Sequence, residues 1–180
     1  MACLLGVTMT LEKYNRGAQV FHWVIAALVI VNLAFGLLHE TLEETVNLMP
    51  THKSIGFTIL LLTLGRIAWR LMWTKPPLPV SIGPFDRAVA SATHAALYAL
   101  MLILPLTGWI FSSPSKYPLN WFGLFDWPRL PVTKEGPFVG PAHEAHEILG
   151  FVMLALVVLH IAAALRHEFV LKNGLIRRMI

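Results

Sequence analysis

The sequence predicts an all-α integral membrane protein, in which a single domain over residues 1–180 forms a bundle of four transmembrane helices. Of the 180 residues, 56% are hydrophobic and 13% are charged, and this charged fraction is about half that of an ordinary soluble domain. In addition, four stretches contain no Asp, Glu, Lys or Arg, and they are residues 17–39, 54–65, 88–115 and 148–165. A soluble protein with four such helices would have too little polar sequence to cover them, so we expect them to cross a membrane.

These stretches predict helices near residues 20–38, 54–73, 91–111 and 147–165. The first and third stretches are long enough to cross the hydrocarbon of a bilayer, and the fourth just reaches the required length of about 18 residues. The second stretch is short, but Arg66 and Arg70 lie at its far end, where long basic side chains can extend to the lipid headgroups. Pro105 removes a backbone donor from the third helix and is expected to kink it.

Two connections between the helices have distinctive compositions. Residues 74–84, TKPPLPVSIGP, are rich in proline and predict an extended turn. Residues 112–142 combine prolines with many aromatic residues, so this segment is too apolar to move freely in water. We expect it to form an aromatic lid at the membrane surface, where Trp and Tyr are favoured. Its aromatic residues include Tyr117, Trp121, Phe122, Phe125 and Trp127.

The distribution of Lys and Arg predicts how the bundle is oriented, because cytoplasmic loops carry an excess of basic residues. Most of the basic residues lie on the side of the two termini, so we expect both termini to be cytoplasmic. They are Lys13, Arg16, Arg66, Arg70, Lys75, Arg87, Arg166, Lys172, Arg177 and Arg178. The first residues, MACLLGVTMT, contain no basic residue, so we expect no cleavable signal peptide and a first helix that remains as an anchor.

Four histidines fall where two haem groups can each be held between two helices. His146 and His160 are fourteen residues apart, which on a helix gives about 21 Å along the axis and nearly the same face. One transmembrane helix therefore presents an imidazole near each membrane surface. By depth, His22 pairs with His160 at the inner side, and His52 pairs with His146 at the outer side. We expect the first, second and fourth helices to enclose two haems, with the third helix as packing.

The residues around these histidines fit a bound porphyrin. A small residue follows each of the four by one helical turn, on the same face, where a porphyrin needs room; these residues are Ala26, Gly56, Gly150 and Ala164. The other four histidines have Glu43, Tyr98, Glu147 and Leu171 at that position. The single cysteine, Cys3, allows neither an internal disulfide nor a CxxCH attachment, so a haem would be held by ligation and packing alone.

His143 is an alternative to His146, because the run HEAHE offers two histidines. The seventeen residues between His143 and His160 correspond to about 260° of rotation, which puts His143 on nearly the wrong face. We therefore prefer His146 as the ligand.

The remaining polar groups near the predicted haems have other expected roles. His94 begins the third helix and suits a hydrogen-bonded packing role or a bond to a haem propionate, whereas His39 and His167 are expected to be solvated. Arg66 follows His52 by fourteen residues, so it should stand near the inner haem. There Arg66 can pair with a propionate or extend to the headgroups.

A series of short motifs runs through most of the chain in a fixed order. They are YNRGAQVFHW at 14–23, HKSIG at 52–56, RIAWR at 66–70, PPLP at 76–79, HAALYALMLILPLTG at 94–108, HE at 146–147, LHIAAALRHEFV at 159–170 and NGLIRRM at 173–179. The series resembles the bacterial cytochrome b561 family, and this resemblance implies a multi-pass protein of the inner membrane with two haem b groups. It implies His22, His52, His146 and His160 as the iron ligands. The chain departs from some relatives at Ala145, where they have Trp, and at the additional His143.

The resemblance also implies a function in electron transfer to or from quinone, with periplasmic superoxide as the donor in the best-matching branch. Two axial imidazoles saturate the iron, which fits one-electron transfer rather than oxygen activation. On the outer side, acidic residues outnumber basic ones, so only a local cluster could steer an anion. The candidates are Lys53, Lys116, Arg129 and Lys134, which otherwise are ordinary solvated charges.

Two other functions are compatible with the sequence. One is a non-enzymatic cytochrome b subunit that carries electrons from a partner dehydrogenase or hydrogenase to quinone. The other is a haem-free transporter whose histidines line an ion path. The short loops favour a self-contained superoxide:quinone oxidoreductase, with membrane lipid and quinone as partners and no nucleic acid.

Overall fold

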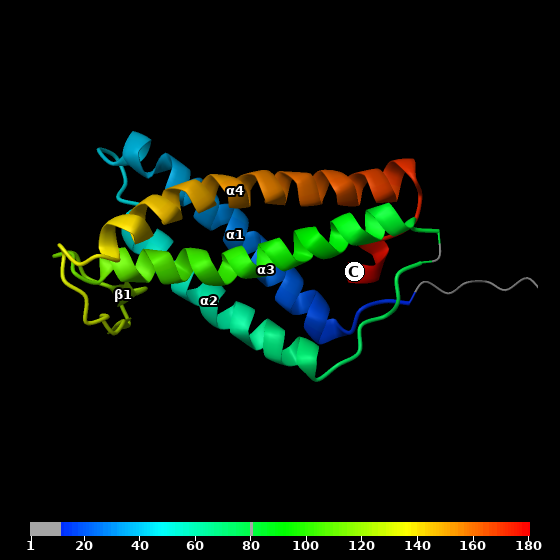
Figure 1. The fold of residues 1–180 in the computed structure, drawn as a ribbon, viewed down its shortest axis with the longest axis horizontal. Helices are drawn as coiled ribbons and strands as arrows, with labels where there is room; N and C mark the ends of the chain where they lie inside the picture. Colours follow the sequence, from blue (N-terminus) through cyan, green and yellow to red (C-terminus); the bar gives the residue numbers. More distant parts are fainter. Residues whose placement is uncertain (1–11, 80) are drawn as a thin grey trace, which may run out of the picture.

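The computed structural model describes residues 12–79 and 81–180, and Cys3 lies outside them. Four long helices dominate the fold (Figure 1): α1 (Arg16–Leu42), α2 (Met49–Leu71), α3 (Pro84–Ser112) and α4 (Val139–Leu165). A short π-helical turn, Arg166–Val170, continues α4. Each of the four is long and apolar enough to cross a membrane. The predicted class of an all-α protein with four transmembrane helices is therefore confirmed.

The helices extend beyond the ranges that the uncharged stretches predicted. α3 begins at Pro84 rather than near residue 91, and α4 begins at Val139 rather than near residue 147. A count of uncharged residues stops at the first charge, whereas a helix can continue until its backbone is interrupted. α2 likewise begins early, at Met49 rather than near residue 54, but its C-terminal end at Leu71 falls short of the predicted range. The predicted end at 73 was therefore two residues too late.

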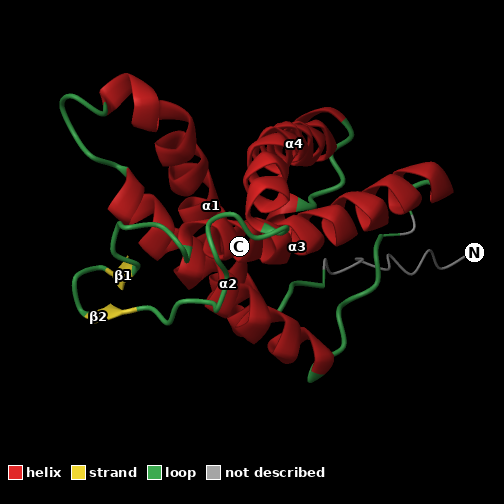
Figure 2. Cartoon of the chain, turned by 60° about the vertical axis from the view of Figure 1, so that its left-hand side comes forward, coloured by secondary structure: helices red, strands yellow, loops and turns green. Residues whose placement is uncertain are grey.

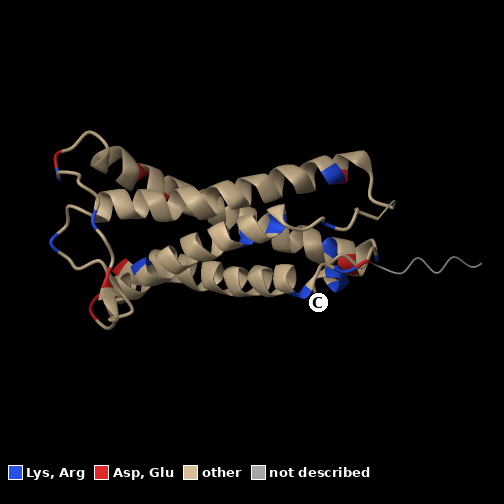
Figure 3. Cartoon of the chain, turned by 90° about the horizontal axis from the view of Figure 1, so that it is seen from below, with Lys and Arg blue, Asp and Glu red and all other residues tan. Residues whose placement is uncertain are grey.

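The helices run up and down, and both ends of the described chain, Glu12 and Ile180, therefore lie at one end of the bundle. We call the end that contains Arg16, Leu71, Pro84 and Leu165 the terminal end, and the opposite end the loop end. Lys and Arg gather around the terminal end, whereas most of the acidic residues lie at the loop end (Figure 3). This is the charge asymmetry on which the predicted orientation rests.

The most extensive helix packing is between α1 and α2 and between α3 and α4, and α2 also packs on α3. A cluster of buried apolar side chains joins all four helices midway between the two ends; it consists of Ile25, Val29, Ile55, Ile59, Leu100, Met101 and Met153. Large apolar side chains such as Ile30, Leu61, Phe151 and Leu159 are exposed on the helices, as expected for surfaces that face lipid.

The aromatic connection between α3 and α4, which we call the lid, folds onto α2. Strands β1 (Asn120–Trp121) and β2 (Phe125–Asp126) pair antiparallel in a small hairpin at the loop end (Figure 2). The Trp121 indole N–H donates to the Thr58 hydroxyl at 3.0 Å. Trp127 stacks on the buried Phe57 with a centroid distance of 4.2 Å. The hairpin was not predicted, because strands of two residues leave too short a pattern to read.

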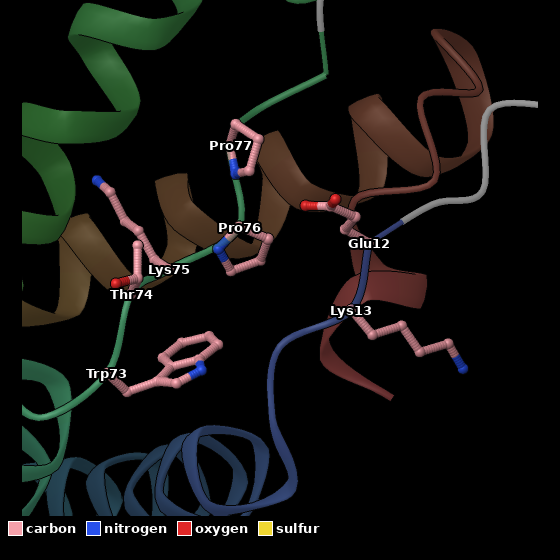
Figure 4. Close-up of a pocket in the computed structure, with 7 residues that line it drawn as sticks. All are labelled: Glu12, Lys13, Trp73, Thr74, Lys75, Pro76 and Pro77. Carbon is pink, nitrogen blue, oxygen red and sulfur yellow. The ribbon is translucent and has the colours of Figure 1, made fainter.

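The C-terminal residues fold back onto the terminal end. Arg178 is 2% exposed, and its guanidinium donates to the carbonyls of Glu12 (2.9 Å) and Pro77 (2.7 Å). This side chain ties the last helical turn, Ile176–Met179, to the start of the chain and to the proline-rich turn. A pocket of about 430 Å³ opens beside this junction (Figure 4), and it is lined by Glu12, Lys13, Trp73, Thr74, Lys75, Pro76 and Pro77. No predicted ligand or steering residue lines it.

Candidate functional site

At the loop end, the structure brings His52 of α2 close to His146 of α4. The centroids of the two imidazole rings are 6.1 Å apart, and the ring planes are 80° to each other. These two helices are not among the closely packed pairs of the bundle, because α2 packs mainly on α1 and α3. The histidine pair therefore lies between two helices that share few close backbone contacts.

At the terminal end, His22 of α1 lies near His160 of α4 in the same manner. Here the ring centroids are 6.3 Å apart and the planes are 75° to each other. α4 thus contributes one histidine to each pair, as the fourteen-residue spacing predicted. The two pairs lie at opposite ends of the bundle core.

The ring spacing in both pairs fits a metal ion held between two imidazoles. A metal bonds an imidazole nitrogen at about 2.0–2.1 Å, so two rings on opposite sides of one metal have their centres about 6.3 Å apart. Both measured spacings, 6.1 and 6.3 Å, agree with this value. Two rings in direct edge-to-face contact can approach more closely, as His94 and His160 do at 5.4 Å. The residues present therefore fit a haem ligated on both faces.

The loop-end histidines are held by hydrogen bonds that leave Nε2 available to a metal. His52 Nδ1 lies 3.0 Å from the Asn32 carbonyl, and His146 Nδ1 lies 2.9 Å from the Leu104 carbonyl. Since a carbonyl only accepts, each Nδ1 carries the hydrogen. Metal-bound histidines usually donate their other ring N–H in this way. The Thr107 hydroxyl lies 3.1 Å from the same Nδ1 of His146.

These supporting groups were not predicted from the sequence, and the expectation that the third helix only packs was wrong. Leu104 and Thr107 belong to α3, which therefore supports a proposed ligand directly. Two of the three groups are backbone carbonyls, which any residue provides, so no sequence pattern could have indicated them.

The terminal-end pair has a different environment. Arg66 Nη2 lies 3.4 Å from His22 Nδ1, and its guanidinium lies over the ring of Tyr98 at 5.2 Å from the centroid. Arg66 thus stands beside the terminal-end pair, as its position on α2 predicted. His94 contacts His160 edge to face, at a spacing shorter than that of two rings on opposite sides of one metal.

The other histidines have partners of their own. His143 Nε2 lies 3.6 Å from the Glu147 carboxylate, and the side chain of His143 is 55% exposed. His39 Nδ1 lies 2.7 Å from the Gly36 carbonyl, so His39 is less solvated than expected. His167 Nδ1 lies 3.1 Å from the Asn173 side-chain amide.

The four candidate steering residues differ in how their charges are used. Arg129 donates to the carbonyls of Ser113 (2.7 Å) and Tyr117 (2.9 Å), so its guanidinium anchors the lid. The Lys116 ammonium lies 5.4 Å from the centroid of the Tyr117 ring. Lys53 follows His52 directly in α2 and is the candidate nearest in sequence to a proposed ligand, whereas Lys134 lies in the connection before α4.

Comparisons with known proteins agree with this arrangement. A family model described as prokaryotic cytochrome b561 matches residues 13–180. Cytochrome b561 homolog 2 of Escherichia coli K12 is 33% identical, over 98% of this chain and 95% of the relative. Cytochrome b562 of Cereibacter sphaeroides is also 33% identical, over 96% of this chain and 98% of the relative. A probable superoxide oxidase of Yersinia pestis is 26% identical, over 94% of this chain and 96% of the relative.

Proposed function

We propose that this chain, which belongs to the prokaryotic cytochrome b561 family, carries electrons between two haem b groups. As a member of that family it is a haem-binding, multi-pass membrane cytochrome of electron transport. His52 and His146 bind the iron of the outer haem, and His22 and His160 bind the iron of the inner haem. The observation that carries this proposal is the presence of two imidazole pairs, at opposite ends, with the spacing of ligands to a shared metal.

The residues of the chain hold and orient the two groups. A haem held between two imidazoles would supply one-electron transfer rather than oxygen activation. The fourteen residues between His146 and His160 place the two levels about 21 Å apart along α4. The apolar core cluster around Ile59 and Met101 separates the levels and excludes water between them. Arg66 is placed to pair with a propionate of the inner haem.

The proposed reaction oxidises superoxide outside the membrane and reduces quinone within it. Two superoxide anions each give up one electron and become dioxygen, while one quinone takes two electrons and two protons to become a quinol. Support comes from the relative named a probable superoxide oxidase and from the basic residues at the loop end. The terminal end faces the cytoplasm in this proposal, because it carries most of the Lys and Arg. The membrane is then the bacterial inner membrane.

The first test is the haem content of the purified protein, measured with a dithionite-reduced minus oxidised spectrum. We expect two low-spin haem b groups per polypeptide. A single haem per chain contradicts the pairing, since one pair would then be empty. A folded protein without haem, expressed with adequate haem supply, would instead favour the transporter.

Neutralising two lysines at the loop end should slow reduction of the protein by superoxide. Lys116→Gln together with Lys134→Gln is expected to lower the rate by about two- to tenfold and to flatten its dependence on salt, because local positive charge raises the concentration of an anion. Stopped-flow measurement of haem reduction by a superoxide source at several ionic strengths gives both quantities. Arg129 is left in place because its guanidinium anchors the lid.

A matched control removes two lysines from the terminal end, with Lys13→Gln and Lys75→Gln. This variant has the same net charge as the test variant, so a long-range effect of total charge would slow both equally. An unchanged rate in the loop-end variant would remove anion steering by Lys116 and Lys134 from the proposal.

A further inference from the structure

Two glycines on neighbouring helices lie directly against the loop-end histidines. A Cβ atom at Gly36 of α1 would be 3.0 Å from His52 Cε1 and 3.4 Å from His52 Nδ1. A Cβ atom at Gly108 of α3 would be 3.2 Å from His146 Cε1 and 3.4 Å from His146 Nδ1. The 3.0 and 3.2 Å distances are tighter than most real Cβ contacts, so a larger residue would push the imidazole ring aside by a few tenths of an ångström.

Each glycine lies four residues after the residue whose backbone carbonyl contacts the histidine. Gly36 follows Asn32 by four residues, and Gly108 follows Leu104 by four residues. Residues four apart share a helix face, and the carbonyl of the first accepts the N–H of the second. The same carbonyl can accept a second hydrogen bond from a donor that passes beside the residue four positions later. When that residue is glycine, the absence of a side chain leaves room for an imidazole to donate this second bond. We call each combination of carbonyl and glycine a carbonyl–glycine cradle.

The cradle on α3 has an additional polar group. Thr107 lies one residue before Gly108, and its hydroxyl is 3.1 Å from His146 Nδ1. The same hydroxyl donates to the carbonyls of Ile103 (3.0 Å) or Leu104 (2.9 Å), so its oxygen accepts from His146. The Nδ1–H of His146 is thus shared between two acceptors, whereas His52 has the Asn32 carbonyl.

The terminal-end histidines lack such a cradle within the described residues. His22 Nδ1 faces the Arg66 guanidinium at 3.4 Å, and Arg66 can only donate. The residues described around His160 offer it an edge contact with His94 and no hydrogen bond shorter than 3.5 Å. The two ends of the bundle therefore hold their imidazoles by different means.

We infer that the two carbonyl–glycine cradles are positioning elements, which fix the Nδ1–H tautomer and the near-perpendicular ring planes of His52 and His146 and thereby set the potential of the outer haem. This inference rests on the proposed ligation by these two histidines. A ring N–H that donates to a carbonyl makes the imidazole a stronger electron donor to a metal. Such ligands stabilise the oxidised iron, so the cradles lower the potential of the outer haem relative to the same ligands without them.

The test replaces each glycine with alanine in the full-length protein. We expect Gly36→Ala and Gly108→Ala each to raise the midpoint potential of one haem and to shift its low-spin electron paramagnetic resonance signal, while the other haem is unchanged. The signal is informative because its anisotropy depends on the angle between the two imidazole planes. Gly140→Ala is the matched control, since it adds the same methyl group to α4 where no atom lies within 4 Å apart from the neighbouring backbone of the helix.

Thr107 provides a second, milder test that does not crowd the ring. Thr107→Val removes the hydroxyl acceptor at nearly constant volume and should raise the potential of the same haem by a smaller amount. Thr107→Ser keeps the hydroxyl and should restore the wild-type potential. If an alanine variant loses both haems through misfolding, the comparison of Thr107→Val with Thr107→Ser decides the question.

The same series separates this inference from the proposed ligation. Wild-type potentials and spectra in both glycine variants and in Thr107→Val overturn the inference, even where His52→Ala and His146→Ala each lose one haem. If instead His52→Ala and His146→Ala retain both haems, the proposed ligation is wrong, and the inference about the cradles is then wrong as well.

Discussion

Replacing His146 with alanine is expected to remove the outer haem and to halve the haem absorbance per polypeptide, whereas replacing His143 leaves both haems in place. His146 faces His52 across a spacing that fits a metal, and its Nδ1 is fixed by the Leu104 carbonyl. His143 instead contacts Glu147 and the ring of Phe111. The haem content of the two purified variants, measured as reduced-minus-oxidised absorbance, distinguishes these neighbouring histidines.

His52→Ala provides the internal check on this result. It should lose the same haem as His146→Ala, so the double variant should retain as much haem as either single variant. A double variant without any haem would mean that His52 and His146 serve different groups. If His143→Ala loses one haem and His146→Ala retains both, the ligand of the outer haem is His143 rather than His146.

Replacing His160 with alanine should remove the inner haem, and replacing His94 should not. The His22 and His160 rings are 6.3 Å apart, as expected for ligands on opposite sides of one iron, whereas His94 lies 5.4 Å from His160. Since the two levels are about 21 Å apart on α4, the outer haem should retain its spectrum in His160→Ala. Haem content and separate redox titration of the remaining group give the result.

The same experiment tests the role of α4 as the helix shared by both haems. His146→Ala and His160→Ala should lose different haems, with distinguishable potentials, and the combined variant should contain none. Loss of the same haem in both single variants would contradict the assignment of one pair to each end. If His94→Ala loses the inner haem while His22→Ala retains it, the third helix supplies a ligand in place of the first.

The four-helix membrane architecture could be predicted from the sequence, because a lipid bilayer requires helices of a certain length with apolar surfaces. Runs of about 20 uncharged residues are visible without any knowledge of packing, and so are the apolar surfaces that lipid demands. The helix ends were read less well, because charge marks the edge of the hydrocarbon rather than the end of a helix. α4 begins at Val139, eight residues before the predicted start at 147.

The pairing of the histidines could be predicted for a similar reason. A helix repeats every 3.6 residues and rises about 1.5 Å per residue, so depth and face follow from residue numbers alone. His22, His52, His146 and His160 were sorted in this way, and the structure brings together the same two pairs. Their role as iron ligands remains a prediction that the variants above test.

The sequence by itself therefore determined the membrane class, the number of helices and the level at which each histidine lies, since all of these depend on composition and local periodicity. Only the tertiary structure decided what holds the rings. The Asn32 and Leu104 carbonyls and the space left by Gly36 and Gly108 come from helices other than those of the histidines they support. A backbone carbonyl is the same in every residue, and whether it meets an imidazole depends on how two helices rotate against each other. That rotation is set by packing across the whole bundle, and no local pattern in the sequence records it.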